Sequence, residues 1–297
     1  MTLSATLSAQ VLAFDSQNAT QGSDLPSSPA EQAPSKSNEA GSPRENESFL
    51  SRVRWTVRLG VSDFQVENSH TPGISAGLKG RYETAGGIRM KMLFTTTLDF
   101  DREHLDSDHI PVWFKSYLKA EKDFFTFSPG IRLLGTGDLE HKMNTVSSIE
   151  QSADLMAGLK LQFETRRAEL FAKFGAGGYY LEIDDDLPRE YSDYRREDLS
   201  SSEFAWFQEY KGKLKFAEKF SISARYKNFR STDNMSLETR KEIKLTYQFH
   251  PARQIVLKAE KTWYNLDQFA RSAGDNGLEV LPFDEDTHYQ AYVEFGF

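Results

Sequence analysis

Residues 288–297 read HYQAYVEFGF and decide the fold, because apolar and polar side chains alternate along the whole stretch. The first set consists of Tyr289, Ala291, Val293, Phe295 and Phe297, and the second, mostly polar set consists of His288, Gln290, Tyr292, Glu294 and Gly296. In a β-strand, successive side chains point to opposite faces, so a period of two separates the faces. The stretch therefore predicts a strand with one apolar and one polar face.

The same period of two recurs from residue 52 onward. In the first such segment, the apolar Trp55, Val57 and Leu59 alternate with arginines and other polar residues, and the spacings of three and four that a helix needs are missing. The twelve segments are 52–61, 74–83, 88–98, 112–120, 125–133, 155–163, 168–180, 204–216, 220–226, 243–249, 255–263 and 289–297. Most are roughly ten residues long, which is what a tilted strand needs to cross a bilayer.

The connections between these segments alternate in length. Short ones are expected at 84–87, 121–123, 165–167, 217–219 and 250–252, and longer polar ones at 100–109, 136–150, 184–202 and 266–285, with brief polar ones at 69–72 and 231–236. Short turns at one end and longer loops at the other are typical of a membrane barrel, whereas nothing makes the loops of a β-sandwich alternate in this way. We predict an all-β fold: a single antiparallel, up-and-down transmembrane β-barrel of about 12 strands over residues 51–297.

The composition agrees with strands rather than helices as the membrane-crossing elements. Hydrophobic residues make up 38% of the chain, and no apolar run approaches the 18 residues of a helical span. Aromatic residues reach 13%, with 22 Phe and 12 Tyr, which suits the aromatic belts of a barrel at the two membrane interfaces. The absence of cysteine excludes disulfides, thiol catalysis and cysteine-ligated metal.

The first fifty residues have a different character. Residues 1–13 are small and mildly apolar, and we interpret them as the remnant of a secretory signal peptide, although the missing basic region leaves a disordered leader as the alternative. Residues 14–50 are rich in Ser, Pro, Ala, Gln, Asn and Glu. Such a stretch buries too little apolar surface to offset its ordering entropy, so it is predicted to be a disordered periplasmic tail.

The ending of the chain resembles the C-terminal signal by which Gram-negative outer-membrane β-barrels are recognised for insertion. Here the signal would be carried by Tyr289, Val293, Phe295 and Phe297. The resemblance implies the bacterial outer membrane as the location, with membrane lipid, lipopolysaccharide and the barrel assembly machinery as partners. We expect a monomer with no cofactor, no metal and no nucleic-acid partner.

If the apolar sets face lipid, the interleaved sets face the lumen and make it basic. The expected lumen cations are Arg54, Arg58, Lys79, Arg81, Arg89, Lys91, Lys115, Lys119, Lys160, Lys173, Lys211, Lys213, Lys215, Arg225, Lys227, Lys244 and Lys258. The chain as a whole carries a formal charge of -8, so its excess acid lies in the tail and loops. Unpaired cations in a low-dielectric wall attract anions, and rings of Lys and Arg select anions in pores. The pattern favours a channel for small anionic solutes; the alternative is a lumen filled by salt bridges.

In size, strand number and basic lumen, residues 52–297 resemble the small monomeric porins for acidic oligosaccharides, the oligogalacturonate-specific porin family. In that family, inward Arg and Lys are understood to guide sugar carboxylates, so the resemblance implies an acidic oligosaccharide as solute. It rests on architecture, because no family-specific motif can be matched residue by residue. Four inward aromatic residues, Trp113, Tyr117, Phe207 and Tyr292, are expected either to stack on sugar rings or to fill space.

An enzyme is not expected, but two further function classes stay open. Some barrels resemble outer-membrane phospholipases, whose histidine base must reach a serine nucleophile. None of the six histidines of this chain begins a His-x-Ser-Asn pattern. The alternatives to a channel are therefore a lipid-modifying or hydrolytic barrel enzyme built in another way, or a structural barrel whose external loops bind a partner.

Overall fold

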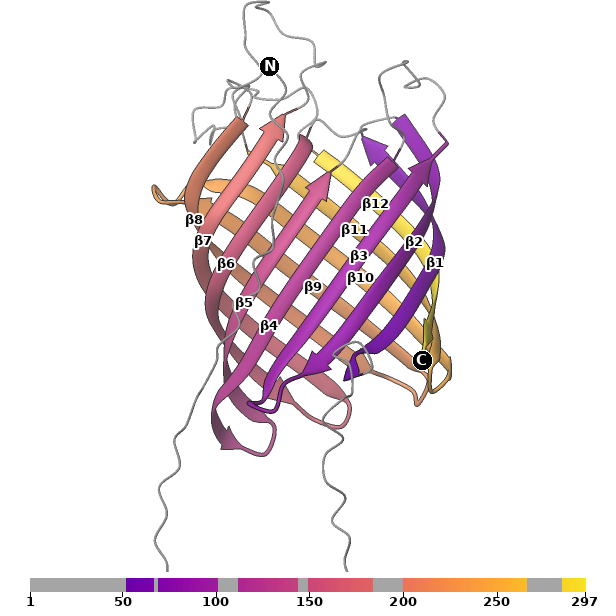
Figure 1. The fold of residues 1–297 in the computed structure, drawn as a ribbon, viewed down its shortest axis with the longest axis vertical. Helices are drawn as coiled ribbons and strands as arrows, with labels where there is room; N and C mark the ends of the chain where they lie inside the picture. Colours follow the sequence, from indigo (N-terminus) through magenta and orange to yellow (C-terminus); the bar gives the residue numbers. More distant parts are fainter. Residues whose placement is uncertain (1–51, 67–68, 101–111, 144–148, 184–199, 266–284) are drawn as a thin grey trace, which may run out of the picture. The chain divides into compact units, whose positions relative to one another are not determined.

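The computed structural model describes residues 52–66, 69–100, 112–143, 149–183, 200–265 and 285–297. The described residues form twelve strands: β1 (Arg54–Val66), β2 (Ser69–Glu83), β3 (Ile88–Asp99), β4 (Val112–Ser128), β5 (Ile131–Met143), β6 (Ile149–Glu164), β7 (Ala168–Ile183), β8 (Ser200–Lys215), β9 (Phe220–Ser231), β10 (Ser236–His250), β11 (Arg253–Tyr264) and β12 (Glu285–Gly296). Each strand is antiparallel to its neighbours in the chain, and β12 pairs with β1 to close the barrel (Figure 1). The predicted fold is confirmed. The predictions for residues 1–13 and 14–50 fall outside the described residues.

Alternate residues of each strand face the outside and the inside of the barrel. On the outside, Leu155 is 64% exposed and Ile243 is 59% exposed, whereas the inward Phe207 is completely buried. Closure leaves no sheet edge with unpaired backbone groups, which hydrocarbon would penalise heavily. A closed antiparallel barrel with an even number of strands and an apolar outer wall is the form that spans the bacterial outer membrane, so we place the chain there. No helix in the described ranges is long and apolar enough to cross a bilayer.

The five connections β2–β3, β4–β5, β6–β7, β8–β9 and β10–β11 are tight and lie at one end of the barrel, together with the end of β12 (Figure 1). We call this the tight-turn end, and it faces the periplasm in barrels of this class; the other is the external end. The expected short connections at 84–87, 165–167, 217–219 and 250–252 are confirmed, within a residue or two. At the external end, β9 and β10 are joined by the expected brief turn, in which Asn234 has a φ of 66°.

The connection predicted at 121–123 is wrong. β4 continues through these residues to Ser128, and the chain reverses at Pro129 and Gly130 instead. Gly130 has a φ of 97°, in the left-handed region that favours glycine. Residues 121–123 are all charged, which is typical of a turn. However, Glu121 points into the lumen and forms an ion pair with Lys119 at 2.7 Å, so these residues continue the strand.

The loop predicted at 136–150 is also largely wrong. β5 extends to Met143 and β6 begins at Ile149, which leaves only 144–148 between them, outside the described residues. The outward positions of this part of β5 include Gly135 and Gly137, which have no apolar side chain. The alternation of apolar and polar residues is therefore interrupted here, and the sequence pattern does not predict a strand. The loop predicted at 69–72 is likewise the start of β2.

Candidate functional site

A cavity of about 320 Å³ lies in the lumen, and its lining carries more positive than negative side chains. The lining cations are Arg58, Lys91, Lys115, Lys119, Lys142, Lys160, Lys211, Arg225, Lys244 and Lys258, and the lining acids are Glu140, Glu169, Glu209, Glu242, Glu260 and Asp286. Ten cations against six acids leave a formal excess of four positive charges. The cavity is therefore the candidate functional site.

Nine of the seventeen cations predicted for the lumen line this cavity, and eight do not. The eight are Arg54, Lys79, Arg81, Arg89, Lys173, Lys213, Lys215 and Lys227. Arg54, Arg81 and Lys215 are exposed near the tight-turn end, whereas Lys173 and Lys227 are buried in the wall. Of the three predicted lumen lysines on β8, which are Lys211, Lys213 and Lys215, Lys211 alone reaches the cavity lining.

Most of the predicted cations have an acidic partner. Lys119 and Lys160 contact the same carboxylate, Glu121, at 2.7 and 3.0 Å. The other pairs are Arg58–Glu294 at 2.7 Å, Lys79–Glu294 at 3.5 Å, Arg89–Asp123 at 2.5 Å, Lys115–Glu140 at 2.9 Å, Arg225–Glu209 at 2.7 Å and Lys258–Glu260 at 2.7 Å. These pairs reduce the positive potential of the wall without removing it, because several acids are shared by two cations.

Seven predicted cations have no carboxylate within 4.0 Å among the described residues: Arg54, Arg81, Lys91, Lys211, Lys213, Lys215 and Lys244. Three of them, Lys91, Lys211 and Lys244, line the cavity. These three ammonium groups are therefore the unpaired positive charges of the cavity lining.

Four of the cations form one row across four adjacent strands. Arg54 on β1 is directly opposite Arg81 on β2, Arg81 is opposite Lys91 on β3, and Lys91 is opposite Lys119 on β4. Directly opposed like charges destabilise a sheet unless something of opposite charge neutralises them. We call these four residues the cation row. It begins with the exposed Arg54 at the tight-turn end and ends at the buried Lys119 in the cavity lining.

Part of the lumen next to β5–β10 is filled by packed side chains. Lys173 contacts Asp138, Lys227 lies 3.5 Å from Asp154, and Arg240 lies 2.9 Å from Glu140. Beside these pairs is a buried apolar cluster of Ile149, Met156, Tyr179, Leu181, Ile183, Ala205, Phe207, Phe229, Leu237 and Tyr264. The alternative of a lumen filled by salt bridges therefore describes this part of the lumen, although Glu140, Ile149 and Tyr264 also line the cavity.

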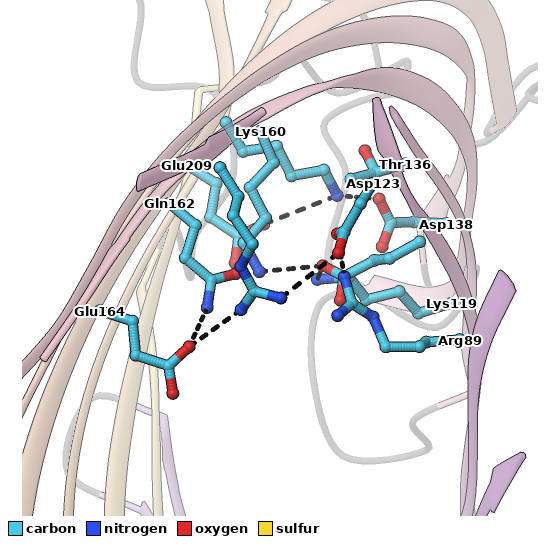
Figure 2. A network of polar contacts seen from close by, with 12 residues as sticks. Arg89, Lys119, Asp123, Thr136, Asp138, Lys160, Gln162, Glu164 and Glu209 are labelled. Atoms are coloured by element: carbon cyan, nitrogen blue, oxygen red, sulfur yellow. Dashed lines mark hydrogen bonds and ion pairs between the residues drawn. The ribbon is translucent and has the colours of Figure 1, made fainter. Parts of the chain in front are cut away.

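A second set of ion pairs crosses the wall at the tight-turn end. Asp123 contacts Arg89 on one side and Arg132 on the other, and Arg132 lies 2.9 Å from Glu164. Figure 2 shows the side chains of Arg89, Asp123 and Glu164 in this network, with Lys119 and Lys160 close by. These ion pairs link β3, β4, β5 and β6, so Arg89 contributes to the stability of the barrel wall and does not line the cavity.

Three of the four predicted inward aromatic residues, Trp113, Tyr117 and Tyr292, line the cavity, whereas Phe207 is part of the buried cluster. The guanidinium of Arg58 lies 4.1 Å from the centre of the Tyr292 ring. Trp113 donates a hydrogen bond to Asp99 at 2.9 Å, and its ring contacts Phe64. Tyr292 and Trp113 are thus already engaged, and their stacking on a sugar ring stays a prediction.

Several charged residues of the lumen were missed from the sequence, and of these Glu140 and Lys142 line the cavity. Asp138, Glu140 and Lys142 lie on the part of β5 that was taken for a loop, and Glu238 lies beside a bulge in β10. His288, which contacts Phe64 and Trp113 at the edge of the cavity, had no recognisable partner in the sequence. The alternation Asp138, Glu140, Lys142 with Leu139 and His141 between them was the signal that could have extended β5.

The contacts of the histidines in the described ranges show no arrangement of base and nucleophile. His70 contacts Asp63 and Gln65, His141 contacts Gln151, and His250 accepts a hydrogen bond from the backbone amide of Ala252. None of these contacts joins a histidine to a serine or threonine hydroxyl. In the described part of the chain there is also no group of three or more acidic or histidine side chains that could hold a metal ion.

The residues of the predicted insertion signal lie on the outward face of β12. Tyr289 and Phe297 are exposed, and Val293 and Phe295 are half-buried on the same face. The backbone amide of Phe297 donates a hydrogen bond to the carbonyl oxygen of Trp55 at 3.1 Å, so this segment takes part in closing the barrel. Recognition by the assembly machinery stays a prediction.

No protein-family model matches the chain, and no curated protein matches it. Among solved structures it is similar to the KdgM porin in complex with disordered oligogalacturonate, at 10% identity over 81% of this chain and 99% of that chain, with a TM-score of 0.45. It is similar to the NanC porin at 12% identity over 80% and 98% of the two chains, with a TM-score of 0.46. It is also similar to an anion-selective porin from Comamonas acidovorans at 8% identity over 82% and 99%, with a TM-score of 0.38. Each likeness concerns the barrel architecture alone.

Proposed function

We propose that this outer-membrane barrel conducts small anionic solutes through its basic lumen. The observation that carries the proposal is the cation row, in which Arg54, Arg81, Lys91 and Lys119 stand opposite one another on neighbouring strands. Repulsion along this row is relieved when an anion lies against it. Because the row runs from the tight-turn end into the cavity, it provides successive binding points along a path.

The charges of the cavity support transient rather than tight binding. Lys91, Lys211 and Lys244 offer ammonium groups without a carboxylate within 4.0 Å among the described residues, while the acids Glu209 and Glu242 elsewhere in the cavity lining keep the attraction for an anion moderate. Conduction requires that a solute bind favourably enough to enter and weakly enough to leave. A solute with one or more carboxylates meets both conditions here, and an acidic oligosaccharide, with charges spaced along a chain, could contact several cations of the row at once.

The test is planar-bilayer recording of the purified protein under a KCl gradient. We expect a conductance whose reversal potential has the sign of anion selectivity. In the variant Arg81→Glu/Lys91→Glu, two members of the row change sign, so the reversal potential should move toward that of a cation-selective pore. The control is Lys122→Glu/Lys219→Glu, which makes the same change of net charge at exposed positions near the tight turns, outside the cavity lining.

Two results would contradict the proposal. One is a wild-type protein that inserts into the bilayer and carries no current. The other is a reversal potential that responds equally to the row variant and to the control, because selectivity would then follow net charge rather than the row.

A further inference from the structure

The lipid-facing wall carries two lysines directly opposite each other near the external end. Lys241 on β10 and Lys261 on β11 are register partners, and both point outward. Just below them, toward the middle of the membrane, Ile243 and Leu257 are exposed apolar residues of the lipid-facing surface. The two lysines therefore mark the level at which hydrocarbon ends and lipid headgroups begin.

The two ammonium groups gather around one indole ring. The Nζ atom of Lys241 lies 4.6 Å from the ring centre of Trp263, and that of Lys261 lies 5.0 Å from the same centre. Trp263 is itself fixed, because its Nε1–H donates a hydrogen bond to Glu285 at 2.7 Å. The geometry holds two positive charges close together instead of letting them diverge into solvent.

The local acids do not balance these charges. Glu285 contacts Lys261 as well as Trp263, whereas Lys241 has no carboxylate within 4.0 Å among the described residues. Opposed like charges destabilise a strand pair, so a bound anion would stabilise this one. At the depth of the lipid headgroups, the anion present next to the outer wall of the barrel is the phosphate of a membrane lipid.

A third cation occurs on the neighbouring strand. Arg230 on β9 lies over the ring of Trp206 at 5.4 Å, and its guanidinium is held by Asn228 at 2.8 Å and by Asn234 at 3.1 Å. Asn234 is the positive-φ residue of the β9–β10 turn, so the turn itself positions this side chain. Arg230 could contact a second phosphate of the same lipid or a neighbouring one.

From these observations we infer that Lys241, Lys261 and Trp263 form a binding site for a phosphorylated lipid of the external leaflet, with Arg230 as an additional contact. The expected ligand is lipopolysaccharide, bound through a lipid A phosphate. The site lies at the external end of the barrel, where this lipid forms the outer leaflet. The site is on the outer wall and is independent of the lumen.

Native mass spectrometry of the detergent-purified protein titrated with diphosphoryl lipid A tests the site. Wild type should retain the lipid, and Lys241→Gln/Lys261→Gln should weaken its retention roughly 30-fold, as expected for the loss of two lysines near a charged lipid surface. Lys241→Arg/Lys261→Arg keeps both charges and should bind within a few-fold of wild type. The matched control is Lys122→Gln/Lys219→Gln, which removes two exposed lysines near the tight turns and should bind as wild type.

Three outcomes would overturn the inference: equal loss in the site variant and the control, undiminished binding in the site variant, or retention of phosphatidylglycerol as strongly as lipid A. Heat-modifiable migration on electrophoresis verifies that each variant is folded, and if the glutamine variant does not fold, the single change Lys241→Gln replaces it. Ion selectivity in bilayers should be the same in all these variants, so failure of this site and failure of the channel proposal are distinguishable.

Discussion

Among single residues, the buried lysine Lys173 shows how charge is tolerated inside the wall. Its side chain is 1% exposed and contacts Asp138, with Glu209 at 3.9 Å as a second acid. Its ammonium also lies 4.9 Å from the ring centre of Phe207. Removing one partner of a buried pair leaves an uncompensated charge, whereas replacing both partners by apolar residues does not.

We therefore expect Asp138→Ala to lower the free energy of unfolding by about 3–5 kcal/mol. The double variant Asp138→Leu/Lys173→Met should recover most of that loss. Urea-dependent unfolding in lipid vesicles, followed by tryptophan fluorescence, measures both. A double variant no more stable than Asp138→Ala would show that Lys173 is not held by this carboxylate.

For single residues, the sequence predicted which face of a strand a side chain occupies better than it predicted the residue with which that side chain pairs. Alternation alone placed Lys91, Lys211 and Lys244 on the lumen side, where the structure finds them in the cavity lining. It could not show that Lys173 is neutralised, because its partner Asp138 was assigned to a loop. An ion pair across a barrel joins residues far apart in the chain, and the spacing within one strand carries no information about it.

Among the elements, the β4–β5 hairpin depends on one glycine. Gly130 has a φ of 97°, and a Cβ added there would lie 2.3 Å from the backbone oxygen of Glu164. A side chain in this left-handed conformation costs roughly 1–3 kcal/mol, and the neighbouring backbone cannot move away easily. Gly137, on β5 of the same hairpin, has nothing within 4 Å of its added Cβ.

Gly130→Ala should consequently lower the free energy of unfolding by roughly 1–3 kcal/mol, while Gly137→Ala should change it by about 0.5 kcal/mol or less. The same unfolding measurement compares the two variants. Equal effects would mean that the hairpin does not need the left-handed residue at this turn.

The hairpin also shows why element boundaries were the weakest part of the sequence prediction. Strand number and order followed from period-two segments, which are local. The end of β4 did not, because Glu121, Lys122 and Asp123 have the composition of a turn but continue the strand ladder. What decides the position of the turn is the backbone conformation of Gly130, and the Pro129–Gly130 pair was the available signal.

For the whole molecule, one arrangement accounts for the fold, the cavity and the outer lipid surface. Pairing of β1 with β12 closes the cylinder, and the alternation of side chains along each strand then places one set against lipid and the other around the lumen, where ten cations and six acids line the cavity. The chain contains no cysteine, so single cysteines can be introduced without altering any other residue.

The most direct test is the reaction of four single-cysteine variants in vesicles with anionic and cationic methanethiosulfonate reagents, with rates normalised to a free thiol. Thr95→Cys and Gln290→Cys lie in the cavity lining, and their neighbours Thr96→Cys and Ala291→Cys lie on the lipid-facing side. We predict that the two lumen cysteines react, and react faster with the anionic reagent, while their neighbours are protected. Equal reaction of neighbouring positions, or faster reaction with the cationic reagent, would contradict a basic, water-filled lumen.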